Sequence, residues 1–384
     1  MVNKPKIWET PMPKWVLILL ASVICGCSSG GSQVVYITPT PFVENALEAV
    51  TCPSPGRCIA VGWSKDYTKG LYSTLIEENT GSGWKIVSSP GLTTGLGSRL
   101  YGVACATPGR CIAVGQTQDL ASRSKTLILE NAGNSWTIVP SPNAIAFGLD
   151  TGRLVGIACP RPADCLAVGG YEVETGNYHT LIEENAGQGW EVITSPNAER
   201  GDSDLSQITC PTATQCLAVG SIAVENNGQG WVVGTYPTKG SLSAVSCVAS
   251  ERCIGVGGES LGGFPPVLAP LIFDKSDQNW TISSEGGVLG WLNSVTCQTA
   301  NHCIAVGEND SYGALIEEQR GEGWKIVDTS TFAGNVKLSG VTCPSATHCI
   351  AVGEVGHEAT AIADDIGSGW TLASSPNVGP AGAR

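Results

Sequence analysis

The repeat that decides the fold of this chain first occurs at residues 47–62, LEAVTCPSPGRCIAVG, and has the pattern L-x-x-[VI]-x-C-x5-C-[IL]-x-V-G. Seven copies of it occur along the 384 residues. Their first cysteines lie 53, 54, 51, 37, 50 and 46 residues apart. A period of this length, with short runs rich in Val and Ile, is typical of the blades of a β-propeller.

Each unit continues in the same way after its V-G. In the first unit a variable stretch leads to the apolar run TLI at residues 74–76, then to a Gly-x-x-Trp turn and a short segment that ends at Ser-Pro. We interpret this as four strands, named a to d in chain order. Seven such units predict an all-β fold, a seven-bladed β-propeller of four antiparallel strands per blade. A linear β-solenoid is the alternative, although its repeats are usually shorter.

The unit boundaries predict a propeller domain at residues 45–384, with blades that start near residues 46, 99, 153, 204, 241, 291 and 337. The fourth unit is short, because Cys216 and Trp231 lie 15 residues apart and the corresponding distance elsewhere is 21–27. We therefore expect a tight turn between strands b and c, near Gly220 and Ser221, and a short blade.

The N-terminus reads as an export signal. Lys4, Lys6 and Lys14 precede the apolar run VLILLASVI at residues 16–24, which is too short to span a bilayer as a helix. The run ends in Ile24-Cys25-Gly26-Cys27, which resembles the lipobox of bacterial lipoproteins. The resemblance implies a signal peptide at 1–26, a lipid on Cys27, a flexible tether at 27–44 and a membrane-anchored protein outside the cytoplasmic membrane or on the cell surface. An ordinary cleaved signal is the alternative.

The chain has 16 cysteines, of which 14 form seven C-x5-C pairs in the repeats. In an exported protein such pairs favour disulfides. A five-residue loop places the two cysteines opposite each other on strands a and b, within disulfide range. Zinc would need pairs that converge, and blades radiate apart. The predicted disulfides are Cys52–Cys58, Cys105–Cys111, Cys159–Cys165, Cys210–Cys216, Cys247–Cys253, Cys297–Cys303 and Cys343–Cys349.

Composition limits the partners. The formal net charge of −13 argues against nucleic acid. The sequence contains no H-E-x-x-H or P-loop motif, and its four histidines have no metal-ligand spacing. We therefore predict no cofactor, no metal and a monomer.

Acids recur at the end of strand c, as in Glu77 and Glu78, and are expected to be solvated rather than to bind Ca²⁺, because they are spread around the ring.

The turns between strands c and d carry a recognisable motif. They read Asn79-x-Gly81-x-x-Trp84 in the first unit and Asp365-x-Gly367-x-x-Trp370 in the last, with similar turns at Trp136, Trp190 and Trp231 and weaker ones at Trp280 and Trp324. This resembles the Asp-box of bacterial neuraminidase-type repeats. The family includes sialidases, photosystem II assembly factors and secreted binding proteins. The resemblance implies that these turns lie opposite the ligand face. No Arg-Ile-Pro segment of the sialidases is present, so the resemblance extends to the fold and not to the activity.

A ligand is therefore expected on the face formed by the b–c and d–a loops. The residue before the Leu of strand a should sit at the channel mouth, where Arg side chains could hold a carboxylate. The alternative is a set of strand ends in mutual salt bridges. Aromatic residues of the b–c loops, Trp63 and Tyr171 among them, could stack on a sugar or anchor a partner. The predicted mouth residues are Ala46, Arg99, Arg153, Asp204, Ser241, Trp291 and Lys337.

These features predict a binding or scaffold module for an extracellular protein or glycan. A glycan-active enzyme, sialidase-like hydrolase or lyase, in the same channel is the first alternative, and we lean against it because no pair of loop carboxylates stands out. An assembly factor of the photosystem II type is the second alternative.

Overall fold

The structure is a computed structural model, and its described part runs from residue 43 to 379 without residues 93–94, 134, 147–148, 175–176, 200, 251, 264, 278, 286 and 322. The chain divides into two units, Met1–Thr40 and Pro41–Arg384, and the fold below is that of the second. The expected signal peptide, Cys27 and nearly all of the tether lie outside the described residues. Within the described part, no helix has the length and apolar character to cross a membrane.

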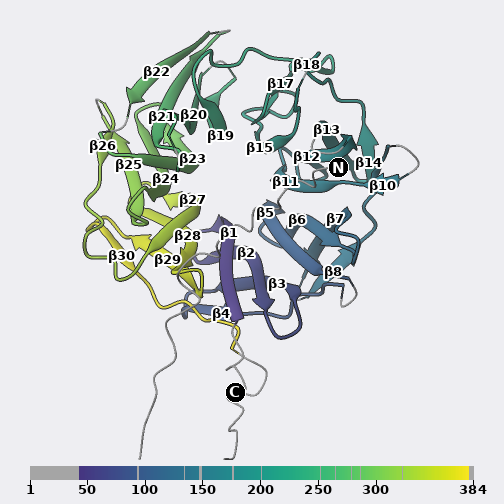
Figure 1. Cartoon of the computed structure of the whole chain (residues 1–384), viewed down its shortest axis with the longest axis horizontal. Coiled ribbons are helices and arrows are strands. Elements are labelled where there is room, and N and C mark those ends of the chain that lie inside the picture. The colour runs from purple at the N-terminus through teal and green to yellow at the C-terminus, as the bar shows by residue number, and fades with distance from the viewer. Residues whose placement is uncertain are drawn as a thin grey trace, which may run out of the picture. The chain divides into compact units, whose positions relative to one another are not determined.

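The described strands form a ring of four-stranded antiparallel sheets (Figure 1). Five sheets stand alone, and an eight-stranded sheet combines the first two blades through a single parallel bridge between Tyr72 and Gly97, which gives seven blades. The prediction of a seven-bladed propeller is confirmed. The inner strands, strand a of each blade, are β1 (Val43–Ser54), β5 (Gly97–Thr107), β11 (Arg153–Ala158), β15 (Leu205–Thr209), β19 (Ser241–Ala249), β23 (Gly290–Thr299) and β27 (Val336–Ser345).

The other strands follow outward in chain order. The b strands are β2 (Arg57–Asp66), β6 (Arg110–Gln118), β12 (Asp164–Glu174), β16 (Cys216–Gly220), β20 (Arg252–Ser260), β24 (His302–Asn309) and β28 (His348–Val355). The c strands are β3 (Leu71–Asn79), β7 (Ser124–Ala132), β13 (Asn177–Ala186), β17 (Ala223–Asn226), β21 (Leu268–Ser276), β25 (Ala314–Arg320) and β29 (Ala359–Asp365). The d strands are β4 (Trp84–Ile86), β8 (Trp136–Val139), β14 (Trp190–Ile193), β18 (Trp231–Val233), β22 (Asn279–Glu285), β26 (Lys325–Ile326) and β30 (Trp370–Leu372). A two-stranded hairpin, β9 (Ala144–Ala146) and β10 (Leu149–Thr151), connects blades 2 and 3.

The core lies between the blades. Buried side chains form clusters that each combine two neighbouring blades, and one cluster joins Leu47 and Val50 of blade 1 to Ile350 and Val352 of blade 7. The ring therefore closes by the same packing that joins its other blades. Both faces of a blade are buried, which explains apolar runs in place of strict alternation.

A β-bulge follows the Leu of every strand a. In blade 1 the register shifts between Leu47 and Ala49, so that Glu48 has no partner on β2. The same shift occurs in the other six blades. Without it, Leu47 and Val50 would point to opposite faces, because side chains alternate along a strand. The bulge brings both against blade 7 and turns the extra residue toward the channel.

The last glycine of each V-G motif fits this bulge. A Cβ on Gly62 would lie 2.0 Å from the carbonyl oxygen of Ala46, and the corresponding distances in the seven blades are 1.8–2.3 Å. A side chain at this position therefore collides with the backbone of the mouth residue. The repeated glycine is explained by this close approach of two strands.

The seven predicted disulfides are present, with Cα–Cα distances of 3.9–4.1 Å. They join strands a and b at the end of the blade opposite the b–c hairpins. The Asp-box turns lie at the same end. Asn79 Oδ1 and Asp365 Oδ1 accept the N–H of Gly81 and Gly367, at 2.8 Å in both turns. The motif is therefore a structural turn in this protein, as expected.

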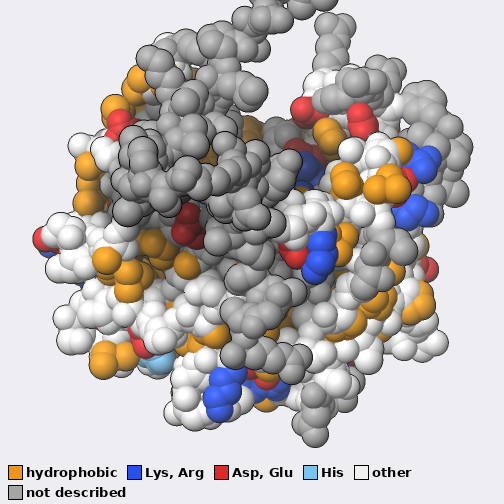
Figure 2. Space-filling view, turned by 60° about the horizontal axis from the view of Figure 1, so that its bottom comes forward, with side chains coloured by type: hydrophobic (Ala, Val, Ile, Leu, Met, Phe, Trp, Pro, Cys, Tyr) orange, Lys and Arg blue, Asp and Glu red, His pale blue; other side chains and the backbone are white. Residues whose placement is uncertain are grey.

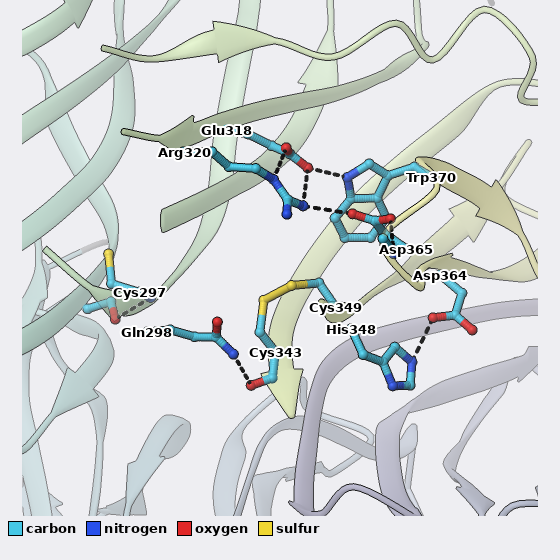
Figure 3. Close-up of a disulfide and its surroundings, with 12 residues drawn as sticks. Cys297, Gln298, Glu318, Arg320, Cys343, His348, Cys349, Asp364, Asp365 and Trp370 are labelled. Carbon is cyan, nitrogen blue, oxygen red and sulfur yellow. Dashed lines mark hydrogen bonds and ion pairs between the residues drawn. A yellow bond between two sulfur atoms is a disulfide. The ribbon is translucent and has the colours of Figure 1, made fainter. Parts of the chain in front are cut away.

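The Asp-box tryptophan also ties blades together (Figure 3). Trp370 of blade 7 donates its indole N–H to Glu318 of blade 6, at 2.7 Å, and Arg320 binds both Glu318 and Asp365. Trp136 of blade 2 makes the corresponding bond to Glu78 of blade 1, at 3.1 Å. In blades 1 and 6, the second acid of strand c therefore contacts the following blade.

The expectation that the strand-c acids are solvated is wrong for the first acid of each pair. Glu77 and Glu183 are 0% exposed and Glu317 is 2% exposed. The hydroxyl of Ser375, in the last blade, donates to Glu77 at 3.2 Å, and Ser141 does the same for Glu183. The sequence analysis missed this burial because the neighbouring blade, which supplies the Ser, covers these carboxyls. Burial raises the pKa of Glu183 to about 8 and the pKa of Glu77 and of Glu317 to about 7.

Candidate functional site

The centre of the ring holds a cavity of about 370 Å³, lined by strand a of all seven blades. Nine of its 19 lining residues carry polar side chains, and the bulges supply six of these nine, because the residue after each Leu points inward. These seven residues are Glu48, Tyr101, Val155, Ser206, Ser243, Asn293 and Ser339. Among the described residues, no group of three or more His, Cys, Asp or Glu side chains is arranged to hold a metal ion.

The predicted mouth residues form a second level, because each lies two positions before the bulge residue of its strand a. In six blades this residue pairs with the residue that follows the V-G glycine, as Arg99 does with Gln116 and Lys337 does with Glu354. Its position is thus fixed by the same register in each blade. Ala46 is buried and Ser241 is exposed, and the charged and aromatic members are partly exposed.

Two arginines of neighbouring blades lie against tyrosine rings at the mouth. The Arg99 guanidinium lies 3.5 Å from the ring centroid of Tyr72, and Arg153 lies 4.9 Å from that of Tyr178. Cation–π contacts of this kind hold a guanidinium in place. Tyr101 lies close enough to interact with both arginines, which partly offset the burial that raises its pKa.

The mouth cations differ in their partners. Arg153 forms an ion pair with Asp204, and Lys337 lies 3.7 Å from Glu308. Arg99 has no carboxylate within ion-pair distance in the described part of the chain. Mutual salt bridges, the alternative considered above, therefore occur at two of the three cations. In the view of Figure 2, the basic and acidic side chains that are coloured also lie in small separate groups.

The predicted aromatic residues lie around the same mouth. Trp291 donates its indole N–H to the Ser243 hydroxyl at 2.7 Å, across the boundary between blades 5 and 6. Trp63 packs edge-on against Tyr72, with ring centroids 5.4 Å apart. Tyr171 contacts the ring of His179 on the hairpin of blade 3, at 5.7 Å. Trp63 and Trp291 thus support polar residues of the channel, and Tyr171 stands on the loop face.

Glu48 is the acid of the channel, and the sequence analysis missed it. It accepts the indole N–H of Trp63 at 2.8 Å. Burial raises the pKa of Glu48, while the hydrogen bond from Trp63 and the charges of Lys337 and Arg99 act against this rise and Glu354 adds to it. The signal that could have found Glu48 is the three-residue spacing in L-x-x-[VI]. When the Leu and the Val or Ile three positions later both face the same neighbouring blade, the strand must contain a bulge, because side chains alternate along a regular strand.

Comparison with known proteins supports the fold alone. No family model and no curated protein matches the sequence. The solved structure of YCF48 from Cyanidioschyzon merolae is similar, with 14% identity, a TM-score of 0.51 and coverage of 85% of this chain and 97% of that chain. The BP39L lectin from Burkholderia pseudomallei has 10% identity and a TM-score of 0.52, over 86% and 97% of the two chains. A Hadza microbial sialidase, Hz136, is similar at 10% identity and a TM-score of 0.47, over 76% and 73%.

Proposed function

We propose that this protein is an extracytoplasmic binding module, which takes an extracellular glycan or protein at the channel mouth. Seven disulfides suit an oxidising location outside the cytoplasm. The observation that carries the proposal is the pair Arg99 and Arg153, each held against a tyrosine ring beside a cavity lined with hydroxyl and amide groups. Fixed donors of this kind lose little conformational freedom when a ligand binds.

Of the two ligand classes, the site favours the glycan. Two of the mouth cations already face carboxylates, so the mouth offers donors and acceptors side by side. Sugar hydroxyl groups both donate and accept hydrogen bonds and can use such pairs. Tyr171 and Tyr178 offer aromatic surface at the same rim.

Binding of the soluble body, residues 28–384, to a glycan array and to candidate proteins tests the function. We expect Arg99→Ala with Arg153→Ala to lower the affinity at least about tenfold, whereas Ile366→Ala, at an exposed side chain on the Asp-box face, leaves it unchanged. Equal binding by both variants would refute the mouth as the site.

The membrane anchor is a separate proposal. A lipid on Cys27 and a tether of residues 28–44 would hold the propeller near the membrane while its loop face stays accessible. Fractionation of cells that produce Cys27→Ala tests it, because the variant should leave the membrane fraction and the disulfide-bonded body should stay intact. Retention of the variant in the membrane would refute the anchor.

A glycan-active enzyme is the second candidate, and Glu48 is the observation that favours it. A half-buried carboxyl with a raised pKa, near a second carboxyl at Glu354 and a phenol at Tyr101, has the features of a general acid. Glu48→Gln separates the candidates. If the protein is an enzyme, the wild type should convert a bound glycan to product and the variant should not. If it is a binding module, neither the wild type nor the variant should form product.

A further inference from the structure

The b–c hairpins form a wall around the channel mouth, and its height varies from blade to blade. In blade 3, β12 continues for five residues past Gly169, up to Glu174, and these pair with β13. At about 3.3 Å per residue this hairpin rises about 16 Å above the glycine. In blade 5, β20 continues to Ser260. Beyond it, the N–H of Leu261 donates to the carbonyl of Val267, and the N–H of Val267 donates to the carbonyl of Gly262, which extends the hairpin further.

Blade 4, between these two, has almost no hairpin. Its strand β16 ends at Gly220 and β17 begins at Ala223. The turn is closed by a bond from the N–H of Gly220 to the carbonyl of Ile222, at 2.9 Å. The wall therefore has its low point at blade 4, next to the mouth residues Arg153 and Asp204, and the short strands of this blade can be followed in Figure 1.

The side chains at the low point are hydrogen-bonding groups. Ser221 donates its hydroxyl to Asp204 at 2.5 Å, and Asp204 also binds Arg153. Tyr236 donates its hydroxyl to the Gly220 carbonyl at 2.7 Å and accepts the N–H of Leu242 at 2.9 Å, so it joins the turn to strand a of blade 5. Lys239 pairs with Glu259 at 2.9 Å. Arg153, Asp204 and Ser221 thus form a chain of hydrogen-bonding groups from the mouth to the turn of blade 4.

The turn of blade 4 is poorly suited to a peptide that would bind as an added strand. The backbone N–H groups of Gly220 and Ser221 already donate to Ile222 and Asp204, so they cannot hold a strand by main-chain bonds. A carbohydrate chain needs no such edge, because its hydroxyl groups use side-chain donors and acceptors.

We propose that blade 4 is the exit of an extended binding path, in which an oligosaccharide chain seated at the mouth continues outward over the Ser221 turn, between the hairpins of blades 3 and 5. The inference rests on the proposed binding function and adds the class and the direction of the ligand. It implies that affinity increases with chain length, since residues beyond the mouth add contacts.

The test raises the wall at blade 4 by lengthening its b–c hairpin. Residues 308–314, ENDSYGA, form the hairpin of blade 6 after Gly307 and are substituted for Ser221 in the full chain. The same seven residues substituted for Gln229, an exposed residue of the Asp-box turn of blade 4, are the matched control, because they lengthen a turn of the same blade on the opposite face. The probes are a disaccharide and longer oligosaccharides of the same composition, chosen from those that the wild-type protein binds. Thermal unfolding and free-thiol content verify that each variant folds with its disulfides.

We expect the wild-type protein and the Gln229 control to bind the longer chains at least about tenfold more tightly than the disaccharide. The graft should lose this difference and keep the affinity for the disaccharide. Binding without length dependence, or a graft that still prefers long chains, would overturn the exit path and leave the mouth site standing. If no oligosaccharide binds the wild-type protein, both the exit path and the glycan-binding function are refuted.

Discussion

Replacing Glu77 by Gln should change how the stability of the propeller depends on pH. Glu77 is 0% exposed, and the hydroxyl of Ser375 in the last blade donates to it at 3.2 Å. Its other oxygen, Oε1, is buried without a partner there. Burial raises the pKa of Glu77 to about 7, with Ser375 and Thr360 acting against the rise.

The sign follows from proton linkage. Below about pH 4.5 the carboxyl is protonated in both the folded and the unfolded chain. Between about pH 4.5 and 7 the unfolded chain releases this proton and the folded chain retains it, so the free energy of unfolding falls as the pH rises. At 1.36 kcal/mol for each pH unit, the loss is about 3 kcal/mol and is complete above about pH 7.

Glu77→Gln cannot ionise, so it should not show this loss. The stability of the variant relative to wild type should increase by about 3 kcal/mol between pH 4.5 and pH 9, measured by urea unfolding followed by Trp fluorescence. Glu78→Gln is the control. It removes the ion pair with Arg57 at 3.5 Å and the negative charge that strengthens the hydrogen bond donated by Trp136, so it should lower the stability at pH 9. Parallel pH profiles of wild type and Glu77→Gln would refute the reasoning.

Three further changes test the scaffold. Gly115→Ala should destabilise the fold by about 2–4 kcal/mol, because its Cβ would lie 1.9 Å from the Arg99 carbonyl oxygen, and urea unfolding measures the loss; Gly109→Ala, in open space, should cost less than about 1 kcal/mol. Cys105→Ala with Cys111→Ala should lower the free energy of unfolding by about 2 kcal/mol, since it removes a short closed loop; a melting temperature equal to wild type would contradict this. Trp370→Phe should lower the free energy of unfolding by about 1 kcal/mol or more, because the hydrogen bond to Glu318 is lost. An equal loss of stability in Trp84→Phe would argue that the packing of the ring alone matters.

The sequence was sufficient for the architecture because the repeat pattern is local. The cysteines, the Asp-box turns and the V-G glycines each act within one hairpin, so their spacing predicts disulfides, blades and the short fourth blade, whose turn lies at Ser221 as expected. The Asn79 and Asp365 side chains also bind within their own turns. Such features need no knowledge of neighbouring blades.

What the sequence did not predict depends on the packing of one blade against the next. Glu77 looks like the end of a solvated strand until Ser375, 298 residues away, is placed beside it. Glu48 sits in a variable position of the repeat, and only the bulge turns it into the channel. The ion pair between Arg153 and Asp204 joins equivalent positions of neighbouring blades. The repeat pattern identified these two positions as equivalent but did not show that their side chains are in contact.

The bulge also separates the scaffold from the site. The leucine before it and the glycine opposite it are the same in all seven blades, and they fix the backbone whatever side chain the bulge carries. The channel residue can therefore change from Glu48 to Tyr101 or Ser206 with little consequence for the core. Glu48→Gln should accordingly alter ligand binding while the free energy of unfolding at pH 4.5 stays within about 0.5 kcal/mol of wild type. A larger loss of stability would mean that the Trp63–Glu48 contact belongs to the scaffold, and the channel would then have less freedom to change its ligand than the repeat suggests.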